Sequence, residues 1–211
     1  STRCWQQGGS SNVSKILMGF VGDLVVNRDN PREVFREVHD VLMAPDLLFG
    51  NLECAYTDAP RPLPGAPAVI SSPASNLDAY HGAGFDVMSL ANNHILDVGP
   101  EAMLETRSRL RAHGIQTCGA GDCSADAHAP AILEVGGLRV AFLAYASIFP
   151  IGHEAGGAKP GLAPMRAYNV WHEPYAAYHA PGMLPMVETQ PDEGDLKQLT
   201  QDLQRARQRA D

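Results

Sequence analysis

Leu90-Ala-Asn-Asn-His94, followed by Asp97 and Gly99, comes directly after the apolar run Phe85-Asp-Val-Met-Ser-Leu90 and decides how this chain is interpreted. The apolar run predicts a buried strand. The polar residues behind it then place two amides, an imidazole and a carboxylate at one edge of a sheet. Unpartnered polar groups cost roughly 1–3 kcal/mol each when they are buried. A metal ion or a charged substrate would satisfy them at this position.

Two earlier apolar runs end in the same way. Gly22-Asp23 follows the run 16–21, and Gly50-Asn-Leu-Glu53 follows the run 47–49. Taken alone, each motif has an ordinary structural explanation, such as a turn, a helix N-cap or a structural histidine. Because three polar strand ends occur in succession, we predict that they share one site.

Strands and helices alternate in the first half of the chain, which predicts an α/β fold with a largely parallel sheet. The first strand is expected to be covered on both faces, and Ser72 or Ser75 to cap the second helix. In such sheets the ligand lies beyond the carboxyl ends of the strands, where all three polar clusters fall. The predicted elements are strands at 15–21, 46–49, 85–90 and 115–118, helices at 31–44, 75–82 and 101–113, and a hairpin at 131–135 and 138–145 around Gly136-Gly137.

The chain divides into four predicted segments. Residues 1–12 lack the apolar core of a secretory signal and are interpreted as a disordered leader or an artificial remnant. Residues 13–147 form the first part of the main domain. Residues 148–192 are rich in proline and have no apolar period, which is typical of a lid or substrate loop. Residues 193–211 are predicted to form a helix that packs on the sheet through an apolar stripe of Leu196, Leu199, Leu203, Ala206 and Ala210.

Composition narrows the class of partner and the compartment. The 211 residues carry a formal net charge of -8, which argues against nucleic acid or an anionic membrane as the main partner. No apolar run approaches the roughly 20 residues that span a bilayer, so a cytoplasmic location is expected. The cysteines form no Cys-x-x-Cys pair and are expected to be free, mostly buried thiols, with Cys54 of interest because it follows Glu53.

The residue types at the three strand ends suit a divalent metal. Asp23 and Glu53 offer carboxylate oxygens, Asn93 an amide oxygen and His94 an imidazole nitrogen. This mixture favours Mn²⁺, Zn²⁺ or Fe over a thiolate site. Neighbouring polar groups would orient these ligands by hydrogen bonds. The predicted orienting residues are Asn51, Asn92 and Asp97.

The same motifs resemble those of CapA-like proteins, the bacterial poly-gamma-glutamate capsule synthesis proteins related to calcineurin-like metallophosphatases. The resemblance covers about residues 14–147 and rests on Gly22-Asp23, Asn51-Leu-Glu53, Asn92-Asn-His-Ile-Leu-Asp-Val-Gly99 and Gly119-Ala-Gly121, followed by the strand at 138–145. It implies a calcineurin-like β-sandwich flanked by helices. It also implies two divalent ions, most simply Mn²⁺, held by Asp23, Glu53 and Asn93, with His94 facing the substrate.

Two departures from the resembled families bear on the chemistry. Ordinary metallophosphatases carry Asp-x-His at the first strand, whereas Val25 stands where that histidine would be. The family's later His-Trp-Gly strand and Gly-His-x-Pro-His turn do not occur here. We therefore predict that the C-terminal part of the domain is missing from this chain, and that the rest of a longer polypeptide, or a second chain, completes the metal site.

The sequence is compatible with three functions. The first is a peptide epimerase, an isomerase that resembles the enzymes inverting the C-terminal residue of lasso-peptide precursors. There the metal would stabilise an enolate while Asp23, with a histidine from the absent portion, moves the Cα proton. The second is a metallophosphoesterase or a poly-gamma-glutamate capsule synthesis factor. The third is a binding module without catalysis. In the enzymatic readings Asp23 and His94 are the predicted catalytic residues.

Overall fold

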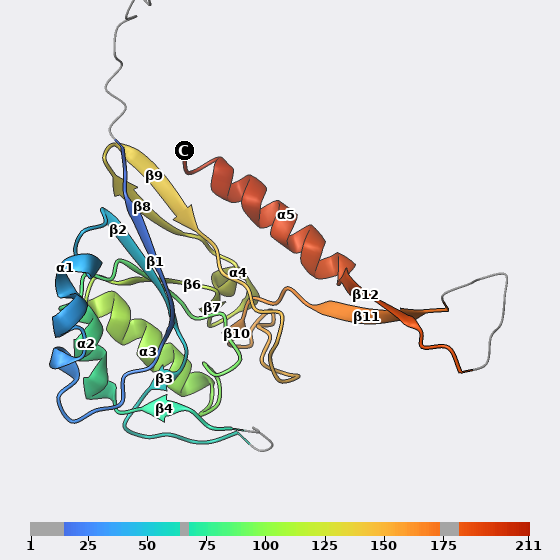
Figure 1. Cartoon of the computed structure of the whole chain (residues 1–211), viewed down its shortest axis with the longest axis horizontal. Helices are drawn as coiled ribbons and strands as arrows, with labels where there is room; N and C mark the ends of the chain where they lie inside the picture. The colour runs from blue at the N-terminus through green and yellow to red at the C-terminus, as the bar shows by residue number, and fades with distance from the viewer. Residues whose placement is uncertain (1–14, 64–67, 174–181) are drawn as a thin grey trace, which may run out of the picture.

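A parallel sheet of four strands, in the order β1-β2-β5-β6, forms the centre of the computed structural model (Figure 1). The strands are β1 (Met18–Leu24), β2 (Leu47–Leu52), β5 (Val87–Ser89) and β6 (Gln116–Cys118). The structure describes residues 15–63, 68–173 and 182–211, so the predicted leader at 1–12 lies outside the described residues. The predicted mixed α/β fold with a parallel sheet is confirmed.

Short helices and two-stranded ribbons surround this sheet. The helical elements are η1 (Pro31–Glu33), η2 (Arg36–Val38), α1 (His39–Leu42), η3 (Ala74–Leu77), α2 (Asp78–His81), α3 (Pro100–Ala112), α4 (Ser124–Ala127) and α5 (Glu193–Arg207). The remaining strands are β3 (Ala55–Tyr56), β4 (Ser71–Ser72), β7 (Ala120–Gly121), β8 (Ala131–Val135), β9 (Leu138–Phe142), β10 (Gly161–Leu162), β11 (Ala167–His172) and β12 (Met186–Pro191). In the described residues, no helix is both long enough and apolar enough to span a membrane.

The two faces of the sheet are covered by different elements. Successive strand residues point to opposite faces, so Leu48 and Met88 face one core while Leu47 and Val87 face another. The first core receives side chains of α2 and α3. The second receives the β8–β9 hairpin, whose Phe142 ring stacks on Phe49 with centroids 5.6 Å apart. The sheet is therefore a middle layer between helices and a β-ribbon.

The register of the sheet aligns the polar strand ends. Asp23 of β1 lies beside Asn51 of β2, and Asn51 lies beside Ser89 of β5. The β1–β2 register shifts between Phe20 and Asp23, an irregularity that falls just before the polar end of β1. The carboxyl ends of three strands therefore meet at one edge, as the sequence predicted.

The first strand is less covered than expected. Within the described residues β1 is an edge strand of the sheet, and Phe20 is 63% exposed. The prediction of a strand covered on both faces was therefore wrong. An apolar run shows that a strand is suited to burial, but the order of the strands decides what lies over it.

The segment 148–192 contains more regular structure than predicted. Strand β10 pairs with β7 beside the main sheet, and β11 pairs antiparallel with β12. Figure 1 shows the β11–β12 ribbon extending away from the body of the molecule. The segment expected to be a loop therefore contains strands, because the cross-strand hydrogen bonds of a ribbon do not require an apolar period. Whether the segment acts as a lid stays a prediction.

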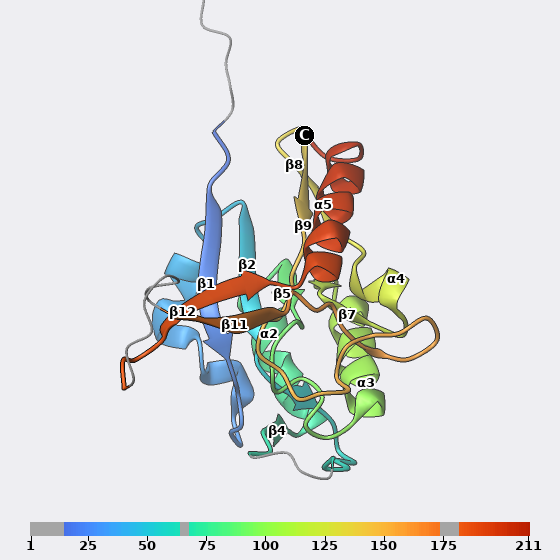
Figure 2. The ribbon, with the colours of Figure 1, turned by 90° about the vertical axis from the view of Figure 1, so that its right-hand side faces the viewer.

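Helix α5 exists as predicted, but its buried face differs. Figures 1 and 2 both show α5 running beside the β8–β9 hairpin. Its buried residues are Asp195, Asp202 and Ala206, whereas Leu203 is 53% exposed. The two aspartates pair with polar groups of the neighbouring elements, Asp195 with Arg166 and Asp202 with His128. The predicted leucine contact with the sheet was therefore wrong.

Two smaller predictions also need correction. The helix expected at 31–44 is broken into η1, η2 and α1, and Val41 of α1 is exposed. The cap expected from Ser72 or Ser75 is absent, because Pro73 occupies the cap position and makes no side-chain hydrogen bond. Ser72 instead donates its hydroxyl hydrogen to the Val26 carbonyl, which joins β4 to the end of the first strand.

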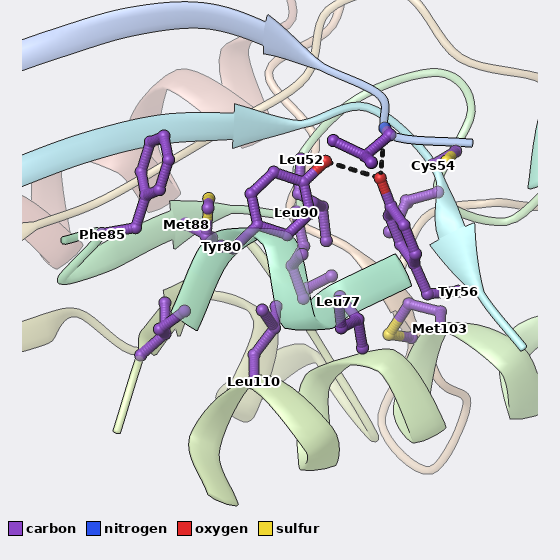
Figure 3. Close-up of a cluster of buried hydrophobic side chains, with 14 of the residues drawn as sticks. Leu52, Cys54, Tyr56, Leu77, Tyr80, Phe85, Met88, Leu90, Met103 and Leu110 are labelled. Carbon is purple, nitrogen blue, oxygen red and sulfur yellow. Dashed lines mark hydrogen bonds between the residues drawn. The ribbon is translucent and has the colours of Figure 1, made fainter. Parts of the chain in front are cut away.

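A pair of buried tyrosines joins the loop after β1 to the helical core (Figure 3). The Tyr56 hydroxyl oxygen accepts the Val26 backbone N–H at 2.8 Å and lies 2.5 Å from the Tyr80 hydroxyl. Both rings are fully buried and meet edge to face. The chain just beyond the polar end of β1 is therefore held by a core side chain.

Tyr56→Phe should lower the free energy of unfolding by about 2 kcal/mol, because it leaves the buried Val26 N–H and Tyr80 hydroxyl without their partner. Urea denaturation followed by circular dichroism measures this loss. Tyr80→Phe is the matched control and should cost less, since Tyr56 keeps its bond to Val26. Equal losses in the two variants would show that the Val26 hydrogen bond does not matter.

Candidate metal centre

Asn51 joins the two acidic residues at the ends of β1 and β2. Its amide nitrogen donates one hydrogen to Asp23 Oδ1 at 2.7 Å and another to Glu53 Oε2 at 2.6 Å. Because one amide group reaches both carboxylates, their side chains converge on a common point. The polar ends of β1 and β2 therefore lie close together, as the sequence predicts.

The charge of Asp23 and partial burial both disfavour the charged form of Glu53. The pKa of Glu53 is raised, first by its partial burial and then by the negative charge of Asp23. In the described part of the chain, neither carboxylate forms an ion pair with a lysine, arginine or histidine. A divalent cation would remove this repulsion.

Asn92 and Asn93 have different roles: Asn92 stabilises the fold, and Asn93 is a candidate ligand. Buried Asn92 donates to the Leu52 carbonyl and to Asn51, and its oxygen accepts the backbone N–H groups of His94 and Ile95. It therefore fixes the turn after β5 against the end of β2. The side chain of Asn93 makes no hydrogen bond within the described residues, which leaves its amide oxygen available.

His94 is oriented by Asp97. Its Nδ1 lies 2.8 Å from Asp97 Oδ2, and the same oxygen accepts the Ile70 backbone N–H. Because a carboxylate only accepts hydrogen bonds, Nδ1 carries the hydrogen and Nε2 is left as the reactive nitrogen. The predicted orienting role of Asp97 matches this geometry.

The structure brings together only part of a metal site. In the described ranges, no three histidine, cysteine, aspartate or glutamate side chains are grouped closely enough to hold a metal ion. Asp23 and Glu53 are paired, whereas His94 pairs with Asp97 instead. Cys54 next to Glu53 is buried, and burial raises the pKa of its thiol to about 12, which makes it a packing residue.

Sequence reasoning missed His153 as a neighbour of this region. It lies in the loop before β10, is 7% exposed, and its Nδ1 is buried without a hydrogen-bond partner in the described residues. Burial lowers its pKa, and the charge of Asp97 acts in the opposite direction. A single histidine in a proline-rich segment has no spacing signal that could have placed it there.

The glycines of Gly119-Ala-Gly121 serve packing at this edge. Gly119 has a φ of +88°, and a side chain there would meet the Ala91 Cβ at 2.6 Å and the Ala144 Cβ at 2.9 Å. Ala91 directly precedes the Asn92-Asn93 pair. The glycine therefore lets the end of β6 approach the turn that carries the candidate ligands.

Comparison with known proteins shows which family this chain resembles. The model of the family described as "Bacterial capsule synthesis protein PGA_cap" matches residues 17–211. The uncharacterized protein y4sH of Sinorhizobium fredii is 33% identical over 177 residues, covering 74% of this chain and 38% of that protein. The capsule biosynthesis protein CapA of Bacillus anthracis is 29% identical, covering 72% of this chain and 39% of that protein. The PGA biosynthesis protein CapA of Bacillus subtilis is 24% identical, with 74% and 41% covered.

These comparisons separate the functions that the sequence left open. They support the capsule-synthesis alternative and give no support to the peptide epimerase. The chain spans about two-fifths of the length of the curated relatives it matches. The match over nearly the whole chain shows that this protein belongs to the bacterial capsule synthesis family PGA_cap.

Proposed function

We propose that this chain contributes to a metal-dependent enzyme of capsule synthesis, which acts on a glutamate polymer by hydrolysis-type chemistry. The observation that carries the proposal is the pair formed by Asp23 and Glu53 on the amide of Asn51. Two carboxylates from neighbouring strand ends, without a pairing cation in the described residues, form an arrangement that favours a divalent ion. Membership of the capsule synthesis family supports the biological setting.

The residues present fit a hard divalent cation. Asp23, Glu53 and the free amide of Asn93 supply oxygen donors, which suit Mn²⁺ well, with Zn²⁺ and Fe as alternatives. We propose two such ions in a calcineurin-like fold. Their remaining ligands would come from the rest of a longer polypeptide or from a second chain, since no third histidine, cysteine, aspartate or glutamate among the described residues joins this pair in a group that could hold an ion.

Each residue then has a distinct task. When bound, the metal would activate water and polarise a substrate carbonyl. Asn51 holds the two carboxylates in place, and Asn92 fixes the turn that carries Asn93. His94, held through Nδ1 by Asp97, would take a proton from the attacking water through Nε2 and pass it to the amine that leaves the polymer.

The proposed activity is tested by incubating the intact protein with poly-gamma-glutamate and Mn²⁺. The expected result is shortened polymer chains with new amino groups, detected by gel electrophoresis and an amine-reactive dye. His94→Gln should abolish this reaction without changing the fold. Release of phosphate from a generic ester, or deuterium incorporation at a peptide Cα in D₂O, with the polymer left unchanged, would instead support a phosphoesterase or an epimerase.

Mn²⁺ at about 100 times its dissociation constant should stabilise the protein by about 2.7 kcal/mol, because it binds only the folded state. Differential scanning calorimetry should therefore show a higher melting temperature with Mn²⁺. Glu53→Gln should remove most of this rise. It should also leave the metal-free protein folded, because it relieves the repulsion from Asp23. A full rise in that variant would exclude Glu53 from the site.

A further inference from the structure

A cavity lies between α4 and α5, away from the polar strand ends. Its volume is about 550 Å³, which is within the range of small-molecule sites. None of the residues that line it belongs to the candidate metal centre. Its polar lining residues are Ser124, His128, Gln198, Gln201, Asp202, Arg205 and Arg209.

Asp202 is fully occupied by hydrogen bonds within the protein. Its Oδ2 accepts from His128 Nδ1 at 2.7 Å and from the Tyr145 hydroxyl at 2.9 Å. Its Oδ1 accepts from Gln198 at 2.9 Å and from Arg205 at 2.7 Å. The side chain is also 3% exposed, so the only acid among the described residues that line the cavity has little capacity left for a ligand.

This network fixes one imidazole in the cavity wall. Because a carboxylate only accepts hydrogen bonds, His128 donates from Nδ1 to Asp202. His128 Nε2 makes no hydrogen bond within the described residues, yet it is not among the buried atoms without a partner. It is therefore open to the cavity that His128 lines.

The two arginines add positive charge to the same cavity. Arg205 uses one Nη2 hydrogen for Asp202 and its Nε for the Gln201 carbonyl, which leaves its other N–H groups free. The Arg209 side chain forms no ion pair or hydrogen bond in the part of the chain that the structure describes. Two arginines and a histidine therefore face a cavity whose single acid is already satisfied, in a chain with a net charge of -8.

We propose that the α4–α5 cavity is a binding site for the oxyanion of a small acidic ligand, a carboxylate or a phosphate. Arg209 and the free N–H groups of Arg205 would donate hydrogen bonds to the anion, since a planar guanidinium group can bind two oxygens of a carboxylate or phosphate at once. His128 would contact it through Nε2. The Asp202 network acts as the support that holds His128 and Arg205 in place. The proposal does not depend on the metal centre.

Isothermal titration calorimetry of the whole chain tests this site with two probes, inorganic phosphate and a short γ-glutamate oligomer. We expect at least one of them to bind, and the tighter probe identifies the source of the anion. Arg209→Gln should weaken binding about tenfold, the loss of one charged hydrogen bond. Arg209→Glu should abolish it. In NMR spectra, the imidazole signals of His128 should shift as the probe is added.

Arg207→Gln and Arg207→Glu are matched controls, because Arg207 is the last residue of α5, two positions before Arg209, and does not line this cavity. They should bind the probe as the unmodified protein does. A neutral glutamine oligomer should not bind. The proposal is overturned if neither probe binds, if the Arg207 and Arg209 variants lose affinity equally, or if the His128 signals stay unchanged on binding. Metal uptake by the Arg209 variants should be normal, which separates this result from that of the strand-end centre.

Discussion

Asp23→Asn is expected to lower the Mn²⁺ affinity of the intact protein by about 100-fold or more, because loss of a ligand costs at least as much as loss of an outer-shell partner. The substitution keeps the shape of the side chain, and its oxygen can still accept the hydrogen bond from Asn51. Only one negative charge is removed. Calorimetric titration with MnCl₂ measures the change in the dissociation constant.

Asp29→Asn is the matched control for this experiment. Asp29 is an exposed residue a few positions after β1, and its removal changes the net charge by the same amount. Its Mn²⁺ affinity should stay within about twofold of the unmodified protein, because exposed charges are screened at physiological salt. If both variants lost affinity equally, Asp23 would act only through the overall charge.

Asp202→Ala is expected to lower the free energy of unfolding by about 1–3 kcal/mol, because it leaves the imidazole of His128, whose side chain is 9% exposed, without its hydrogen-bond acceptor. Leu203→Ala, at the next position of α5, should cost under about 0.5 kcal/mol, since Leu203 is 53% exposed. Urea denaturation of both variants measures the difference. This order is the reverse of what the apolar stripe of the helix suggests, so a larger loss in Leu203→Ala would show that α5 packs differently.

Local signals in the sequence were sufficient to predict some helices and strands. Helix α3 begins at Pro100 and ends before Gly114, whose φ of +84° suits the residue after a helix. The β8–β9 turn uses Gly136 and Gly137, both with positive φ. In these cases the residues that decide the structure lie within the element itself. The sequence therefore predicted them with nearly correct bounds.

Elements whose burial depends on distant neighbours were predicted less well. The periodicity of α5 shows where its leucines lie, but not that His128, Tyr145 and Arg166 stand opposite and require acidic partners. Likewise, the apolar run of β1 does not reveal that the strand lies at the edge of the described sheet. Strand order and polar pairing are tertiary properties, and a single-sequence pattern does not contain them.

The candidate site was predictable as a set of strand ends but not in its detailed contacts. Parallel pairing places Asp23 beside Asn51, which follows from the alternation of strands and helices. The use of one Asn51 amide for both carboxylates depends on side-chain conformation. The approach of His153 to Asp97 depends on a loop with no periodic signal. The sequence therefore predicted which residue types gather at the strand ends, but not which side chains contact one another.

The most direct measurement is anomalous X-ray scattering at the manganese edge from crystals of the protein grown with Mn²⁺. We expect a peak within bonding distance of a carboxylate oxygen of Asp23 and one of Glu53. That peak should be missing from crystals of the Asp23→Asn variant. Manganese bound elsewhere, or touching neither carboxylate while both remain hydrogen-bonded to Asn51, would contradict the assignment of this strand edge as a metal centre.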